Sequence, residues 1–137
     1  SLRMAIHNSL VAEEKYGKVV HWKRKYLRGL DGRVLPVRSI HSALNLLLQS
    51  CGAVICKNWI VDLEEALVSK HKLVHGEDFM YMAWVHDEVQ IACRTETIAK
   101  LCVSEAQEAI RRTQQKYNFR VQLDTEGKIG KTWADCH

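Results

Sequence analysis

The pattern of apolar and polar residues predicts a helix followed by a hairpin over residues 1–38. Apolar residues at partial helical spacing favour a helix over 4–15, which Gly17 would end. Two strand-like stretches, 19–27 and 34–38, enclose the turn-forming sequence Gly-Leu-Asp-Gly. Pro36 in the second stretch favours an edge strand. We therefore expect a small hairpin after the first helix.

The middle of the chain predicts one long helix. Ser39 can cap it, and the helix would extend to about Lys70. Because its residues are apolar nearly all round, we expect this helix to be buried against a sheet.

The last part of the chain predicts a second hairpin, a second long helix and a further strand. Residues 79–85 and 89–93 are strand-like, and Thr95 can cap a helix to about Tyr117. Apolar residues alternate over 119–123, as in a strand, and the tail from 127 to 137 is expected to be irregular. The predicted class is α+β, in which an antiparallel hairpin and a further strand pack on two long helices.

Length and composition favour a single domain over residues 1–137. With 47% hydrophobic residues, the chain can bury a core. No uninterrupted apolar run reaches the roughly 18 residues of a membrane span, and the N-terminus lacks the order of a signal peptide. Its five cysteines form an odd set without a Cys-x-x-Cys pair, which is typical of reduced thiols. We expect a cytoplasmic protein without membrane partners.

The basic residues are concentrated in one segment. Eight lie between Lys15 and Arg38 against one acid, so this segment carries more than the net charge of +4. Lys23, Arg24 and Lys25 are consecutive, and aromatic residues flank them. Such a strip suits a phosphate backbone, although many basic clusters are simply solvated.

Candidate chemistry is concentrated in the predicted connection of the second hairpin. His86, Asp87 and Glu88 lie between two apolar strands, so a tight turn would hold the carboxylates rigidly and point them outward. Unpaired carboxylates are costly to bury, and a divalent metal is one explanation for them. A plain solvated turn is the other, because aspartate is a favoured turn residue.

A polar stripe follows the long predicted helix. His41, Asn45, Gln49, Gly52 and Cys56 recur at steps of four, four, three and four, which places them on one face. A line of amides can follow the minor groove of a duplex, where acceptors recur at every base pair. A buried amide pair bonded to backbone is the structural alternative.

Several sequences resemble those of a known family. Trp84-Val85-His86-Asp87-Glu88-Val89-Gln90 closely resembles the third catalytic motif of family A DNA polymerases. The replicative polymerases of short-tailed bacteriophages are similar at Ser42-Ala43-Leu44-Asn45-Leu46-Leu47-Leu48-Gln49-Ser50, at Gly-Leu-Asp-Gly-Arg over 29–33, and at Leu-Asp-Thr-Glu-Gly-Lys over 123–128. The resemblance runs from about Ser9 to His137.

This resemblance implies roles for individual residues. Asp87 would be one of two metal-binding aspartates in the palm, Glu88 would support the same metal site, and His86 would touch the primer end. Asn45 and Gln49 match positions that read the minor groove of the nascent duplex. His41 matches a neighbouring position, and His137 would lie near the active site. From the basic segment, we also expect DNA contacts by Lys23, Arg24, Lys25 and Arg33.

The same resemblance implies a two-metal nucleotidyl transfer with Mg²⁺, primer-template DNA and deoxynucleoside triphosphates. The chain lacks the Asp-x-x-x-x-Glu pattern of the first catalytic motif, the fingers residues and an exonuclease. We therefore expect a C-terminal palm segment that is inactive alone, because the metals cannot clamp both oxygens without the second aspartate and the triphosphate site. We do not expect this segment to hold Mg²⁺ by itself.

Two other classes of protein stay open. One is a free-standing, non-catalytic DNA-binding protein derived from a polymerase palm. The other, less favoured, is an unrelated metal-dependent nuclease. If the strand bearing the first aspartate is absent, the palm hairpin would have an open edge, and we expect the chain either to self-associate through this hairpin or to have the hairpin loosened. Its natural partners would then be the missing polymerase segments.

Overall fold

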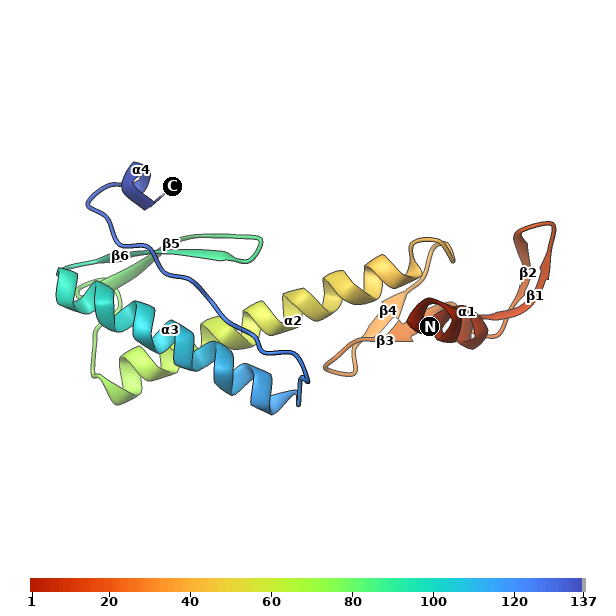
Figure 1. Cartoon of the computed structure of the whole chain (residues 1–137), viewed down its shortest axis with the longest axis horizontal. Helices are drawn as coiled ribbons and strands as arrows, with labels where there is room; N and C mark the ends of the chain where they lie inside the picture. Colours follow the sequence, from red (N-terminus) through yellow and green to blue (C-terminus); the bar gives the residue numbers. More distant parts are fainter. Residues whose placement is uncertain (137) are drawn as a thin grey trace. The chain divides into compact units, whose positions relative to one another are not determined.

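The computed structural model describes residues 1–136 and forms two compact units, Ser1–Val54 and Ile55–His137. The helices and strands labelled in Figure 1 are α1 (Leu2–Leu10), β1 (Val11–Lys15), β2 (Lys18–Trp22), β3 (Tyr26–Arg28), β4 (Val34–Pro36), α2 (Ala43–Glu65), β5 (Phe79–Val85), β6 (Glu88–Cys93), α3 (Glu96–Lys116) and α4 (Trp133–Cys136). The π-helical segment η1 (Ala66–Lys70) directly follows α2. Three separate two-stranded antiparallel sheets join β1 to β2, β3 to β4, and β5 to β6. The predicted α+β class is confirmed.

The first unit contains two hairpins where the sequence predicted one. The predicted helix over 4–15 is too long, because α1 ends at Leu10 and the next five residues form β1. Tyr16 and Gly17 both have positive φ, of 52° and 74°, and they make the tight connection to β2. This is the backbone that two-residue hairpin turns require, so Gly17 reverses a strand and does not end a helix.

The core of the first unit is small and apolar. Its buried residues come from α1, the start of β1, the β3–β4 hairpin with the residue that follows it, and the start of α2; they are Ile6, Leu10, Val11, Leu27, Leu35, Val37 and Ala43. The turn at Gly29 to Gly32 joins β3 to β4 as predicted, with Gly32 at a φ of 83°. The Gly29 N–H donates to the Arg33 carbonyl at 2.9 Å, which closes this turn.

The second unit packs α3 and the β5–β6 hairpin with the C-terminal part of α2 and η1 (Figure 1). Trp59, on α2, donates its indole N–H to the Ala106 carbonyl on α3 at 2.8 Å. Buried beside it are Leu63, Leu67, Phe79, Cys102, Ala109 and Ile110. Thr95 caps α3 as predicted, because its hydroxyl accepts from the Ile98 N–H at 3.2 Å.

Two further predictions, about the segment 119–123 and about the long helix, are wrong. The segment 119–123 forms no strand; it is irregular, and the Leu123 N–H donates to the Gln114 side chain at 2.7 Å. The long helix is also less buried than predicted, since Leu48 is 55% exposed and Val61 63% exposed. Two-stranded hairpins are narrow and offer too little apolar surface to cover a helix of 23 residues.

The helical stretch Ala43–Lys70 is long and apolar enough to cross a membrane when judged on length and composition alone. The sequence pattern did not predict this. The same test is met by core helices of soluble proteins, so the finding is weak evidence for a membrane span.

Candidate functional site

The predicted tight turn at His86 is present. His86 and Asp87 are the two residues between β5 and β6, and the register pairs Val85 with Glu88 directly across them. His86 has a φ of 56°, a left-handed conformation that histidine, asparagine and aspartate adopt more readily than most residues. The Trp84 indole N–H donates to the His86 carbonyl at 3.0 Å and secures the turn.

The two carboxylates of this turn are exposed and differ in their surroundings. Glu88 begins β6, and its Oε1 accepts a hydrogen bond of 2.9 Å from the Gln90 amide, two residues along the same strand. Burial first, and then the negative charge of Asp87, raise the pKa of Cys56. Asp87 therefore lies within electrostatic reach of Cys56 on α2.

The donor set at the turn fits part of a magnesium site. Mg²⁺ prefers oxygen ligands and is commonly bound through one or two carboxylates together with substrate phosphates and waters. Asp87 and Glu88 supply two such carboxylates next to each other in sequence. Over residues 1–136 no group of three or more His, Cys, Asp or Glu side chains could hold a metal ion. The turn can thus contribute ligands, but the described chain does not complete a site.

Asn45 and Gln49 lie one turn apart on α2, and both are exposed. Their exposure excludes the alternative of a buried amide pair. The polar stripe predicted that His41 lies on the long helix, and this prediction is wrong. Residues 40–42 form a turn, and α2 begins at Ala43. The Ser39 hydroxyl accepts from the Ser42 N–H at 3.3 Å within that turn, so Ser39 caps the turn that leads into α2.

The consecutive basic residues form the connection between β2 and β3. The Arg24 guanidinium lies 5.6 Å from the centre of the Tyr26 ring, and Lys25 lies 5.9 Å from the Trp22 ring. These cation–π contacts place the charges beside flat aromatic surfaces. Lys23 donates to the Asn8 carbonyl at 2.9 Å, which ties the connection to α1.

Arg33 is engaged within its own turn. It forms an ion pair with Asp31 at 2.8 Å, and the Arg33 side chain also donates hydrogen bonds to both carboxylate oxygens. These hydrogen bonds lower the pKa of Asp31. A DNA contact by Arg33 would have to share the guanidinium with Asp31. The remaining predicted site residue, His137, lies outside the described residues.

Sequence reasoning missed two polar groups that the fold creates. Glu105 is buried on α3 against Lys70 and His71. The sequence feature that could have indicated this burial is that Glu105 lies on the same face of the predicted helix as Cys102 and Ala109. The second group, centred on Arg3 and His7 of α1, gave no recognisable pattern in the sequence.

Residues 4–135 match the sequence profile of DNA polymerase family A. The match covers nearly the whole chain. The chain therefore belongs to DNA polymerase family A.

Several relatives of this chain are phage enzymes. The DNA-directed DNA polymerases of Enterobacteria phage T3 and Escherichia phage T7 are each 54% identical over 142 aligned residues, which cover all of this chain. That of Escherichia phage Phieco32 is 30% identical over 125 residues and 82% of the chain. The chain spans about a fifth of the length of these relatives: 20% of the first two and 18% of the third.

Proposed function

We propose that this chain is a palm segment of a DNA-directed DNA polymerase and that it supplies one metal-binding aspartate and part of the primer-template surface. The observation that carries the proposal is the exposed pair Asp87 and Glu88, held at a two-residue hairpin turn in a family A chain. The enzyme would act in the cytoplasm of a bacterial host, as expected for a phage polymerase.

In the proposed reaction the primer 3′-hydroxyl attacks the α-phosphate of a deoxynucleoside triphosphate, the bond between the α-phosphate and the bridging oxygen breaks, and pyrophosphate leaves. Two Mg²⁺ ions, when bound, stabilise the attacking and leaving oxygens. In this proposal Asp87 offers its carboxylate as a metal ligand, and Glu88, oriented by Gln90, supports the same site. His86, at the same turn, contacts the primer end. The rigid turn matters because small displacements of positioning groups lower the rate strongly.

The first unit would hold primer-template DNA. The exposed amides of Asn45 and Gln49 can donate to the minor-groove acceptors that every base pair presents, so they would test base-pair shape without reading sequence. His41 would lie beside these contacts. Lys23, Arg24 and Lys25 would neutralise backbone phosphates.

The proposal is tested in the complete polymerase with Asp87→Asn. We expect primer extension to fall by about a thousandfold or more, because several kcal/mol of transition-state stabilisation depend on the metals. Duplex affinity should change little. Asp62→Asn is the matched control, since that residue is only loosely paired with Arg112 at 3.9 Å. Extension at the control rate in Asp87→Asn would remove Asp87 from the metal site.

A non-catalytic DNA-binding role is the second candidate. It is favoured by the exposure of Asn45, Gln49 and the β2–β3 connection, none of which needs a metal in order to bind. Primer extension in a complete polymerase that contains this chain, lost on Asp87→Asn, would exclude this candidate. DNA binding by a protein that shows no such activity would support it.

A further inference from the structure

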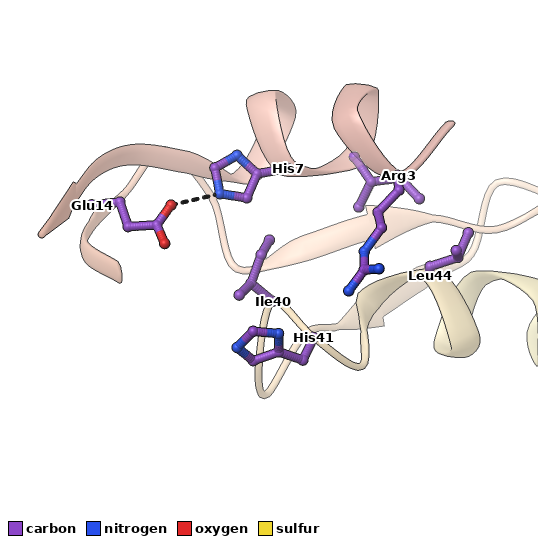
Figure 2. A pocket seen from close by; sticks show the side chains of 7 residues that line it. Arg3, His7, Glu14, Ile40, His41 and Leu44 are labelled. Atoms are coloured by element: carbon purple, nitrogen blue, oxygen red, sulfur yellow. Dashed lines mark hydrogen bonds and ion pairs between the residues drawn. The ribbon is translucent and has the colours of Figure 1, made fainter. Parts of the chain in front are cut away.

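A pocket of about 140 Å³ lies in the first unit between α1, β1 and the residues that lead into α2. Ile6, Ile40 and Leu44 give it an apolar lining. Arg3, His7, His41 and Glu14 give it polar groups. Figure 2 shows the Arg3 side chain extending from α1 toward Leu44 and His41. The pocket thus brings together α1 and the start of α2, which lie far apart in the sequence.

The polar groups of the pocket leave a cationic side chain available. Its one carboxylate, Glu14, is engaged by His7, whose Nε2 lies 2.9 Å from Oε2 (Figure 2). Within residues 1–136, no hydrogen bond or ion pair engages the side chains of Arg3 and His41. An anion that entered the pocket would therefore meet a guanidinium and an imidazole and no unengaged acid.

The apolar lining of the pocket favours an anion that also has an apolar part. A bare inorganic anion gains nothing from Ile40 and Leu44, whereas a sugar-phosphate unit has both a charged group and a carbon-rich ring face. Asn45 directly follows Leu44, and Gln49 lies one turn further along the same exposed side of α2. A nucleic-acid strand that follows these amides has its backbone within reach of the pocket.

We propose that this pocket binds one phosphodiester, with its deoxyribose, of a DNA strand that lies along Asn45 and Gln49. Arg3 donates to the phosphate from α1, and His41 donates from the turn before α2. Ile40 and Leu44 contact the sugar, and the pairing of His7 with Glu14 keeps the carboxylate away from the anion. The inference deepens the proposed function, on which it rests, by adding a backbone contact that α1 provides.

The test measures binding of a labelled DNA duplex by the 137-residue chain at several salt concentrations. Arg3→Met should weaken binding about threefold to tenfold at low salt and reduce the salt slope by about 0.9, the value for one phosphate contact. Arg3→Lys should retain part of the affinity, and His41→Ala should weaken binding by a smaller factor. Arg111→Met removes the same charge from α3, beside Glu108, and is the matched control that should change neither quantity.

A second measurement locates the contact. Single phosphodiesters of the duplex are replaced by neutral methylphosphonates, one position at a time. At one position the methylphosphonate should lower the affinity of the wild-type chain for the duplex. It should not lower the affinity of Arg3→Met further, because that variant already lacks the contact between Arg3 and this phosphate. Independent, additive losses at every position would overturn the proposal.

Two further outcomes would also overturn it. One is an Arg3→Met chain that binds DNA as the control does. The other is an NMR titration in which inorganic phosphate shifts the His41 ring resonances to a plateau, while DNA binding does not depend on Arg3. That result would show that the pocket binds a free anion. These results are independent of the polymerase proposal, because Asp87→Asn tests synthesis and leaves this binding measurement unaffected.

Discussion

The Glu105 carboxylate on α3 accepts a hydrogen bond of 2.7 Å from the Lys70 ammonium at the end of η1. The same oxygen accepts from the His71 imidazole, also at 2.7 Å. Glu105 is only 4% exposed. The hydrogen bonds from Lys70 and His71 lower the pKa of Glu105 against the opposing effect of burial. This buried carboxylate therefore fastens the end of the long helical stretch to α3.

Glu105→Gln should lower the free energy of unfolding by about 1–3 kcal/mol, because an amide accepts from Lys70 and His71 without the charge that strengthens those bonds. The control is Glu108→Gln, one turn along α3, where the exposed pair with Arg111 should contribute within about 0.5 kcal/mol. Urea unfolding at neutral pH measures both. Equal stabilities of the two variants would show that the buried bonds contribute nothing specific.

The stabilisation from Glu105 should also depend on pH. Because the folded-state pKa is below the ordinary value of 4.5, the contribution is fully present above that value and is lost as the pH falls through the lower folded-state pKa. The difference in stability between the wild-type chain and Glu105→Gln should therefore shrink on acidification from neutral pH. Unfolding curves over an acidic pH series test this, and a constant difference would contradict it.

Sequence patterns predicted the second unit better than the first. The helix expected from Thr95 to Tyr117 is α3, and the tight turn expected at His86 is present, because a cap and an alternating pattern are local signals. The predicted helix over 4–15 is wrong for residues 11–15, although Ala12, Glu13 and Lys15 have good helix propensity. These residues become a strand by pairing with 18–22. The alternating apolar residues over 119–123 have no partner strand, so this segment stays irregular.

The candidate site divides in the same way. The turn that presents Asp87 and the exposed amides Asn45 and Gln49 could be found from local patterns and the resemblance. The pocket at Arg3 and the buried position of Glu105 could not, because each depends on segments that lie far apart in sequence and meet only in the fold. The metal and DNA roles of these residues stay predictions.

The Cys102 thiol should be the slowest cysteine to alkylate in the folded chain. Burial, together with a smaller effect of the neighbouring Cys93, whose sulfur lies 3.8 Å away, raises its pKa to about 12. Since the thiolate is the reactive form, iodoacetamide at mildly alkaline pH should label Cys102 far more slowly than in the urea-unfolded chain. Mass spectrometry of each cysteine-containing peptide gives the rates. Similar rates in the folded and unfolded chain would contradict the buried position.

The connection between β2 and β3 should account for much of the salt dependence of DNA binding. Replacing Lys23, Arg24 and Lys25 together by glutamine should lower duplex affinity at low salt and reduce the slope of log K against log salt by up to about 2.7, if all three neutralise phosphates. The matched control replaces Lys100, Arg111 and Lys116 of α3. If the wild-type chain does not bind DNA even at low salt, or binds it with a strong dependence on the DNA sequence, these residues do not contact the DNA backbone as proposed.

The β5–β6 hairpin should make the chain self-associate. It is a two-stranded sheet, so each strand has an outer edge with backbone groups that the hairpin does not pair. Met80, Met82 and Trp84 along β5 are all exposed, which adds apolar surface next to that edge. We expect light scattering to show a mass that rises with concentration.

A single charged substitution in β5 should distinguish association through the β5–β6 hairpin from nonspecific association of exposed apolar side chains. Met82, 63% exposed beside the register irregularity of β5, becomes a charged residue in Met82→Glu, and the variant should stay monomeric at concentrations where the wild-type chain associates. Val121→Glu changes an equally apolar, 71% exposed position in the irregular segment after α3 and should leave association unchanged. Amide exchange over residues 79–93 should slow with concentration in the wild-type chain alone. A strictly monomeric wild-type chain with that hairpin already protected at low concentration would show that its edge is covered from within the chain.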